Sequence, residues 1–232
     1  MPARGTASDI EPAGRRIRGL DAAERRAQRR QQLLDATLDL VATRGYTATS
    51  IEQICQTAYV ATRSFYELFD SKEACYLALF EQMTQGIEDR MVAALGEAPD
   101  DEQEAGRLLV TAFAHALVDD PRIARASFGE GAGISSAVEQ RRRANRRWGA
   151  DFLVGVWQQF GVTAGADGVE RIHTIAVGVI GGMFDLVVDW LHETGAGSDA
   201  AHEPSDAEVD ALVGNLTDFY ELVRDGMASR SG

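Results

Sequence analysis

The strongest constraint on the fold of this chain is the spacing of its apolar residues, which recur every three or four positions along most of its length. The clearest stripe lies within residues 168–192 and comprises Ile172, Ala176, Val179, Ile180, Met183, Phe184, Val187, Val188 and Leu191. Side chains at this spacing share one face of an α-helix. No segment shows the strict alternation of a half-buried strand. The sequence therefore predicts an all-α fold.

Glycine and capping residues predict three helices in the first third of the chain. Residues 21–44 have a helical pattern that ends before Gly45, and glycine suits the position just after a helix C-terminus. Thr49 and Glu52 have the spacing of a capping box, in which two side chains satisfy free backbone N–H groups at a helix start. This pair predicts a short helix to about residue 58, and another is expected at about residues 62–69.

The rest of the chain is expected to form longer helices. Asp70 and Glu73 again have capping-box spacing, and they predict a long helix through Leu95. Proline disfavours helical geometry in the residue before it, so the next helix should end before Pro121. A short helix, a glycine-rich loop and a long helix over residues 135–160 should follow. The last helix is predicted from a second apolar stripe of Val209, Leu212, Val213, Leu216, Phe219, Tyr220, Val223 and Met227.

Charge is unevenly distributed along the chain. The net charge of −13 divides into +2 for residues 1–72 and −15 for residues 73–232. An acidic surface repels phosphate, so any contact with nucleic acid should be confined to the first third of the chain. The N-terminal sequence has no apolar stretch that would serve as a signal peptide, and we expect no apolar run long enough to span a bilayer. These features predict a cytoplasmic protein without membrane contact.

No catalytic or metal-binding motif stands out in the sequence. It contains no GxSxG motif, no P-loop and no GxGxxG motif after a strand, and its four histidines lack metal-ligand spacing. Cys55 and Cys75 are the only cysteines, and we expect them to be buried and inert rather than a redox pair. The sequence therefore predicts neither an enzyme nor a bound metal or cofactor.

Residues 49–69 have the composition of a helix-turn-helix, which needs two short helices, a tight turn and a compact apolar contact. The residues that would make this contact are Ile51, Ile54, Cys55, Phe65 and Phe69. The residues left on other faces of the second helix are Thr62, Arg63, Ser64 and Tyr66. Their side chains can reach bases or phosphates if that helix enters the major groove of DNA.

The first third of the chain resembles the DNA-binding domain of the tetracycline-repressor (TetR) family over the stretch RRQQLLDATLDLVATRGYTATSIEQICQTAYVATRSFYELFDSKEACYLALFE. The matching elements are Leu33-Leu34, Gly45-Tyr46, Thr49, Ile54, Ala58, Val60, Tyr66, Phe69 and Ser71-Lys72-Glu73. The resemblance implies a three-helix DNA-binding domain at residues 21–72 and a larger helical ligand-binding and dimerisation domain at residues 73–232. Residues 1–20 are expected to be a disordered tail.

The resemblance also implies a function and roles for individual residues. The chain would be a sequence-specific transcriptional regulator, most simply a repressor that a small-molecule effector releases from its operator. Thr49 would cap the first short helix and touch a phosphate, and Tyr66 and Lys72 would each bind a phosphate. The residues that would face the groove are Thr62, Arg63 and Ser64, with Arg63 the best candidate for a guanine contact.

Two residues depart from the family pattern in the turn between the short helices. Tyr59 stands where the family usually has a glycine, and Ala61 stands where it usually has a capping serine. A bulky residue at positive φ is strained by about 1 kcal/mol or more. We therefore expect the turn to differ locally, and Tyr59 is a further candidate for DNA contact.

The helical body is predicted to supply both a dimer interface and a ligand site. The last two helices, as an antiparallel pair, can pack against the same pair of a second chain to give a homodimer. Two DNA-binding domains would then read half-sites about one helical turn apart, or a multiple of it. The predicted ligand-binding residues are Phe113, Phe128, Trp148, Phe152, His173 and Phe184, which would suit a largely apolar effector. The alternative for these residues is ordinary core packing.

Several alternatives remain open from the sequence. The arginines within residues 15–30 could form an arm that enters the minor groove. For those within residues 15–18 we favour a disordered tail, and for those within residues 25–30 we favour weak phosphate contacts. The basic cluster at 141–147 is a second DNA site, an anionic-ligand site or, as we favour, an exposed face paired with acids, Glu130 among them. The competing functions are a helical enzyme or carrier and a constitutive DNA-binding protein without an effector.

Overall fold

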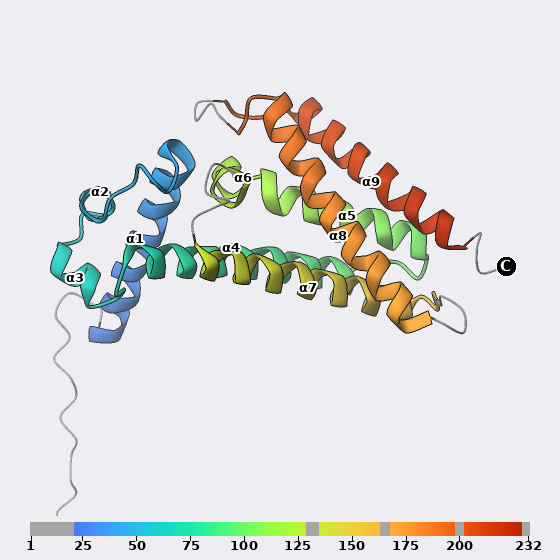
Figure 1. Ribbon diagram of the computed structural model, residues 1–232, viewed down its shortest axis with the longest axis horizontal. Coiled ribbons are helices and arrows are strands. Elements are labelled where there is room, and N and C mark those ends of the chain that lie inside the picture. Colours follow the sequence, from blue (N-terminus) through green and yellow to red (C-terminus); the bar gives the residue numbers. More distant parts are fainter. Residues whose placement is uncertain (1–20, 129–134, 163–167, 198–201, 229–232) are drawn as a thin grey trace, which may run out of the picture.

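The computed structural model describes residues 21–128, 135–162, 168–197 and 202–228, and its regular elements there are all α-helices (Figure 1). The helices are α1 (Ala22–Arg44), α2 (Ile51–Thr57), α3 (Thr62–Tyr66), α4 (Lys72–Gly96), α5 (Glu102–Val118), α6 (Pro121–Phe128), α7 (Ser136–Gln159), α8 (Gly168–Glu193) and α9 (Asp206–Ala228). The predicted all-α fold is therefore confirmed. The predicted tail at residues 1–20 lies outside the described residues.

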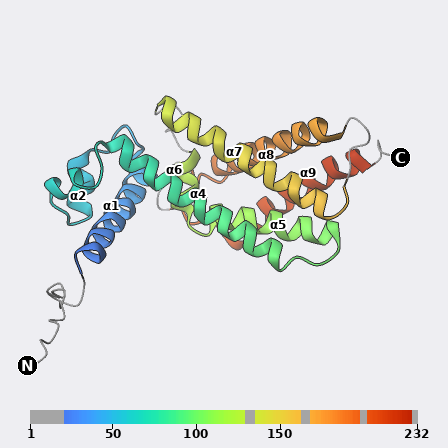
Figure 2. The same ribbon diagram turned by 90° about the horizontal axis from the view of Figure 1, so that it is seen from below.

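The helices form a small head and a larger body (Figures 1 and 2). Helices α1 to α3 make the head, and α5 to α9 make most of the body. Helix α4 belongs to both parts, because it packs against α1 near its start and against α5. The domain boundary that we predict between residues 72 and 73 falls at the start of this shared helix.

One hydrophobic cluster holds the head together. Its fully buried side chains include Leu33 and Leu34 of α1, Ile54 of α2 and Phe65 of α3. Helix α4 adds a further face to the cluster, with Cys75, Tyr76, Leu79, Phe80 and Met83. Ala126 of α6 and Val138 of α7 also belong to this cluster. The head is therefore packed directly onto part of the body.

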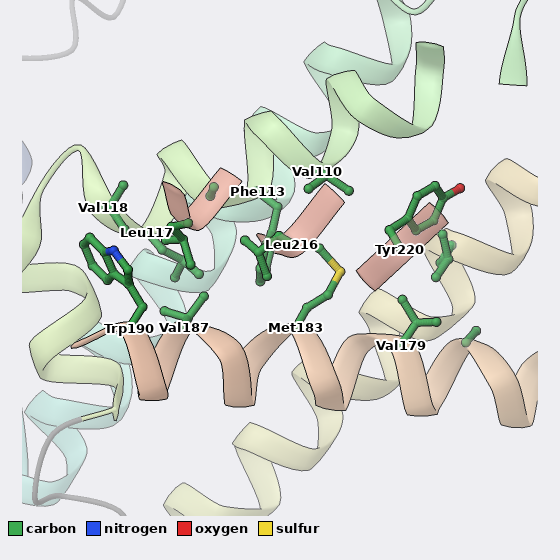
Figure 3. Close-up of a cluster of buried hydrophobic side chains, with 14 of the residues drawn as sticks. Val110, Phe113, Leu117, Val118, Val179, Met183, Val187, Trp190, Leu216 and Tyr220 are labelled. Carbon is green, nitrogen blue, oxygen red and sulfur yellow. The ribbon is translucent and has the colours of Figure 1, made fainter. Parts of the chain in front are cut away.

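A second hydrophobic cluster fills the body between α5, α8 and α9 (Figure 3). The stripe predicted for residues 168–192 faces this cluster, with Ile172, Ala176, Val179, Met183, Val187 and Leu191 buried. Helix α9 adds Leu212, Leu216 and Tyr220, and α5 adds Val110, Phe113 and Leu117. The spacing of apolar residues therefore placed the buried face of α8 correctly.

The start of α2 differs from the expected one by one residue. Ser50, not Thr49, is the N-cap, and its side chain forms a capping box with Gln53 in place of the predicted pair with Glu52. Thr49 instead donates its hydroxyl to the Gly45 carbonyl oxygen, 2.9 Å away. This local hydrogen bond uses Thr49 to close the turn after α1, which leaves the next residue to cap α2.

The start of α4 shows the same kind of shift. The predicted pair of Asp70 and Glu73 does not cap this helix, because Ser71 is its N-cap. The Ser71 side chain accepts a hydrogen bond from the backbone N–H of Ala74, 3.0 Å away. In both helices a serine next to the predicted residue has the extended backbone that an N-cap requires.

One sequence expectation about the membrane needs correction. The segment Arg171–Glu193 of α8 is long and apolar enough to cross a bilayer, with a mean hydropathy of 1.7. The apolar stripe of this helix packs into the body core, and its other faces carry Asp185 and Asp189, both exposed. We therefore assign the apolar stripe of α8 to the protein core, while its other faces lie on the surface of the body.

Close packing of α8 on α9 depends on Gly182. A Cβ atom at this position would lie 2.6 Å from Cζ of the Phe219 ring. We expect Gly182→Ala to lower the free energy of unfolding by about 1–3 kcal/mol, because the ring must move. Chemical denaturation followed by circular dichroism measures this change.

Gly155→Ala in α7 is the matched control, because a Cβ atom there meets no atom within 4 Å. The added methyl group should raise the free energy of unfolding by about 0.5–1 kcal/mol through helix propensity alone. Equal effects of the two substitutions would contradict the packing assigned to Gly182.

Candidate nucleic-acid interface and internal cavity

Helices α2 and α3 pack as the two short helices of a helix-turn-helix. Ile54 and Phe65 are fully buried between them and the rest of the head. The chain turns between the helices over residues 58–61, where the Val60 N–H donates to the Cys55 carbonyl oxygen at 3.0 Å. Phe69 lies next to Phe65, with a ring-centroid distance of 5.7 Å. The inner face of the motif is thus the predicted one.

The turn between α2 and α3 departs from ideal geometry at Tyr59, the residue for which the sequence predicts a departure. Tyr59 has a φ of +54°, and it is the one non-glycine residue with positive φ among the described residues. Its side chain is 97% exposed and therefore gains no packing in exchange for this strain. Ala61 is the N-cap of α3 and makes no side-chain cap. The exposed Tyr59 ring remains a candidate for DNA contact.

The outer face of α3 is open to solvent. Thr62, Arg63 and Tyr66 are exposed, and Ser64 is half-buried. The Arg63 side chain is 92% exposed and its Nε lies 3.3 Å from the Glu67 carboxylate, one helical turn along. An exposed ion pair of this kind adds little stability, so the guanidinium can exchange it for another acceptor. The DNA-contact roles of these four residues stay predictions.

Thr49 does not reach the surface, which corrects its predicted phosphate contact. Only 2% of this residue is exposed, and its hydroxyl is committed to the Gly45 carbonyl oxygen. Ser50, the N-cap of α2, is the more accessible hydroxyl at this helix start.

Lys72 ties the loop after α1 to the start of α4. Its ammonium group donates to the carbonyl oxygens of Tyr46 and Thr49 at 2.9 and 2.7 Å. It also lies 4.2 Å from the centroid of the Tyr46 ring. Burial lowers the pKa of Lys72. Lys72 therefore has a structural role beside its predicted contact with a phosphate, which remains a prediction.

Arginines of α1 border the exposed face of α3. Arg26 donates to the carbonyl oxygen of Glu67 at 3.2 Å, just after α3 ends. The Arg30 guanidinium lies over the Phe69 ring, 5.6 Å from its centroid. These contacts place positive charge beside α3, where DNA phosphates would lie if α3 entered a major groove.

Both cysteines are buried in the head. Burial raises the pKa of the Cys75 thiol to about 11, and the thiol lies 3.3 Å from the Thr37 hydroxyl. A buried, protonated thiol is a poor nucleophile, which supports the inert role that we predict.

A cavity of about 140 Å³ lies between the helices of the body and is partly open to solvent. Residues of α4, α5, α7 and α8 supply most of its wall, and Tyr220 of α9 also contributes. Five of the six predicted ligand-binding residues line it, namely Phe113, Phe128, Trp148, Phe152 and Phe184. His173 does not line it and is corrected here, because its Nε2 faces the Asp151 carboxylate at 3.2 Å and its side chain is 46% exposed.

The cavity wall also contains polar residues that the aromatic pattern did not indicate. These are Thr84, Glu88, Ser127, Arg142, Asn145 and Arg146. The Asn145 amide donates to the Thr84 hydroxyl at 2.6 Å and so joins α7 to α4. The three polar residues of α7 precede Gly149 and Phe152 at helical spacing, and this pattern would have indicated a shared face.

Four of the five arginines in the basic cluster of α7 divide into two sets. Arg141 pairs with Glu81 at 3.3 Å, and Arg143 pairs with Glu139 at 2.9 Å. These two follow the favoured prediction of an exposed face paired with acids. Arg142 and Arg146 instead line the cavity. The predicted partner Glu130 lies outside the described residues.

Known proteins share both the head and the whole fold. Residues 33–79 match the model of bacterial regulatory proteins of the tetR family. The fatty acid degradation regulator FadR from Bacillus halodurans has a TM-score of 0.65 and 18% identity, covering 84% of this chain and 94% of its own. FadR from Bacillus subtilis, solved in complex with stearoyl-CoA, has a TM-score of 0.63 and 23% identity, covering 83% and 96%. A TetR-like transcriptional regulator from Rhodococcus sp. RHA1 has a TM-score of 0.59 and 17% identity, covering 89% and 99%.

The exposed α3 and the packed α2–α3 pair define a helix-turn-helix protein with a separate helical body. The head matches the tetR-family model, and the whole fold is similar to that of TetR-type regulators. Residues 33–79 therefore carry a domain of the tetR-family type, and the chain as a whole has the fold of the TetR-type regulators to which it is similar.

The strain at Tyr59 gives a first test of the turn. We expect Tyr59→Gly to raise the free energy of unfolding by about 0.5–1 kcal/mol. Glycine removes the strain of the positive φ, and this gain in free energy is larger than the loss caused by the greater conformational entropy of glycine in the unfolded chain. Tyr59→Ala keeps the strain and should leave stability nearly unchanged. Denaturant unfolding compares the two variants, and equal values would contradict a strained turn.

Arg63 and Tyr66 give a test of the interface. Arg63→Ala should reduce discrimination between base pairs by about 1–3 kcal/mol at one operator position of each half-site. Tyr66→Phe should weaken binding to all DNA sequences alike, by about 1 kcal/mol, because a phosphate contact carries no sequence information. Binding to a set of single-base operator variants separates these effects. A uniform loss on Arg63→Ala would overturn its assigned role.

Proposed function

We propose that the chain is a homodimeric repressor whose operator affinity falls when a small, largely apolar molecule enters the body cavity. One observation carries this proposal: an exposed helix-turn-helix face and a mostly apolar body cavity lie in one molecule and share α4. Residues 49–69 would form the DNA-binding motif and the cavity would form the effector site. We assign no enzymatic activity, metal or cofactor, and we propose that the protein acts in the cytoplasm.

The exposed face of the α8–α9 pair supports a homodimer. These helices lie side by side on the outside of the body (Figure 1). Apolar residues remain exposed on both, with Val177 of α8 at 43% and Leu222 of α9 at 73%. A second copy of this pair would cover such residues and form a four-helix interface. Two heads would then bind two half-sites of a near-palindromic operator.

Helix α6 offers a physical route between cavity and head. Arg122 of α6 contacts the Asp39 carboxylate of α1 at 2.6 Å. The Tyr76 hydroxyl of α4 donates to the Ala126 carbonyl oxygen of α6 at 2.8 Å. At the end of α6, Ser127 and Phe128 line the cavity. A molecule that moves this end of α6 would therefore disturb the packing that orients α1 and the head.

The fold comparisons agree with a small-molecule effector. One protein of this fold, FadR from Bacillus subtilis, was solved with stearoyl-CoA bound. The cavity here has a mostly apolar wall, which suits a largely apolar ligand. Such a ligand would change operator affinity only if it binds the DNA-bound and DNA-free states with different affinities.

Operator binding and its loss test the function directly. We expect the full-length protein to bind DNA from upstream of its own gene, with an affinity that falls as salt rises. We also expect one compound of a metabolite panel to stabilise the protein thermally and to weaken that binding. The coupling must be reciprocal, so operator DNA should weaken the binding of the compound by the same factor. A ligand that leaves operator affinity unchanged would contradict the mechanism.

A matched pair of variants tests the route through α6. Arg122→Ala should retain ligand binding but reduce the effect of the ligand on operator affinity, because it breaks the contact with Asp39. Arg143→Ala removes an exposed ion pair of α7 with Glu139 and should leave the effect intact. A full ligand effect in Arg122→Ala would show that the coupling takes another path.

A further inference from the structure

Two arginines of α7 line the cavity one helical turn apart, and Arg142 is half-buried whereas Arg146 is exposed to solvent. The Arg142 guanidinium lies 5.8 Å from the centroid of the Phe80 ring and donates to the Ser127 carbonyl oxygen at 2.7 Å. The Arg146 guanidinium lies 5.8 Å from the centroid of the Phe184 ring. Both positive charges therefore lie near aromatic side chains of the cavity wall. A guanidinium has five N–H donors, which is more than the Ser127 carbonyl oxygen and the Tyr76 hydroxyl occupy in Arg142.

These two guanidinium groups have no acidic partner within ion-pair distance among the residues that the structure describes. Glu139 of α7 is bound to Arg143, which is the main cause of its lowered pKa, and the charges of Arg142 and Arg146 lower that pKa further from a longer distance. Glu88 also lines the cavity, but burial and Asp89 raise its pKa and no arginine lowers it. Among the described residues, the region around Arg142 and Arg146 thus carries a local excess of positive charge in an acidic body.

The rest of the cavity wall is apolar and aromatic. The Trp148 and Phe152 rings are stacked with a centroid distance of 5.2 Å. The Phe184 ring contacts those of Phe113 and Phe128 at 5.4 and 5.5 Å. The volume of about 140 Å³ is close to that of a cavity of about 150 Å³ that accepts benzene in another protein. The buried part of a ligand would therefore be a single ring or a short chain.

We propose that the effector is an amphiphilic anion, with a compact apolar body and a carboxylate that Arg142 and Arg146 bind. This inference rests on the proposed function and names the chemical class of its ligand. Guanidinium groups bind carboxylates through paired N–H donors, which favours two arginines over a neutral wall. Arg142 also donates to the Ser127 carbonyl oxygen at the end of α6. A carboxylate that binds Arg142 in place of this oxygen would therefore disturb α6, which packs against the head.

Isothermal titration calorimetry on the full-length protein tests this proposal. The probes are phenylacetate and octanoate, each compared with its neutral amide, phenylacetamide or octanamide, which has the same apolar body. We expect at least one carboxylate to bind about tenfold more tightly than its amide. Arg146→Gln should abolish most of this preference. Arg143→Gln, on the same helix but paired with Glu139 outside the cavity wall, should retain it.

Arg146 is the better position to substitute, because Arg142 also supports α6. Thermal unfolding of each variant checks that the fold is retained. Equal binding of carboxylate and amide, no binding of either carboxylate, or a preference that survives Arg146→Gln would each overturn the proposal.

The outcome is separable from that of the proposed function. A neutral compound that releases the operator while both carboxylates fail would sustain the repressor function and refute the anionic ligand. Carboxylate binding that depends on Arg146 but leaves operator affinity unchanged would sustain the site and refute the repressor mechanism.

Discussion

The burial of Phe65 is the interaction on which the DNA-binding face depends. Helix α3 is only five residues long, and a helix of that length is unstable on its own in water. Its inner side is fixed because Phe65 is fully buried against the head cluster, beside Phe69. The outer side is consequently held outward, with Arg63 and Tyr66 exposed. A rigid core thus presents a very short helix to solvent in one orientation.

The same cluster connects the head to the body. Ala126 of α6 and Val138 of α7 are buried with the head side chains, and the Tyr76 hydroxyl bonds to α6. Residues at the end of α6 then line the cavity, in which Arg142 holds the Ser127 carbonyl oxygen. Packed cores change between discrete arrangements rather than deforming continuously, so a ligand that displaces α6 would reorient the head. The proposed control of DNA binding follows from this continuity of packing.

The sequence predicts helices and buried faces well because apolar spacing reports them directly. It places the buried face of α8, the inner face of α2 and α3, and the strained turn at Tyr59. It fails where neighbouring residues compete for one local role, as when Ser50 rather than Thr49 caps α2. It also misses contacts between distant segments. His173 pairs with Asp151 outside the cavity, and the inward position of Arg142 depends on how α7 packs against α4.

Methylation interference with dimethyl sulfate tests the central claim that α3 reads the major groove as part of a dimer. This reagent methylates guanine at N7 in the major groove and adenine at N3 in the minor groove. The account predicts interference at guanine N7 in two clusters on one face of the operator, about one helical turn apart or a multiple of it. Interference confined to adenine N3, or a single cluster, would contradict it.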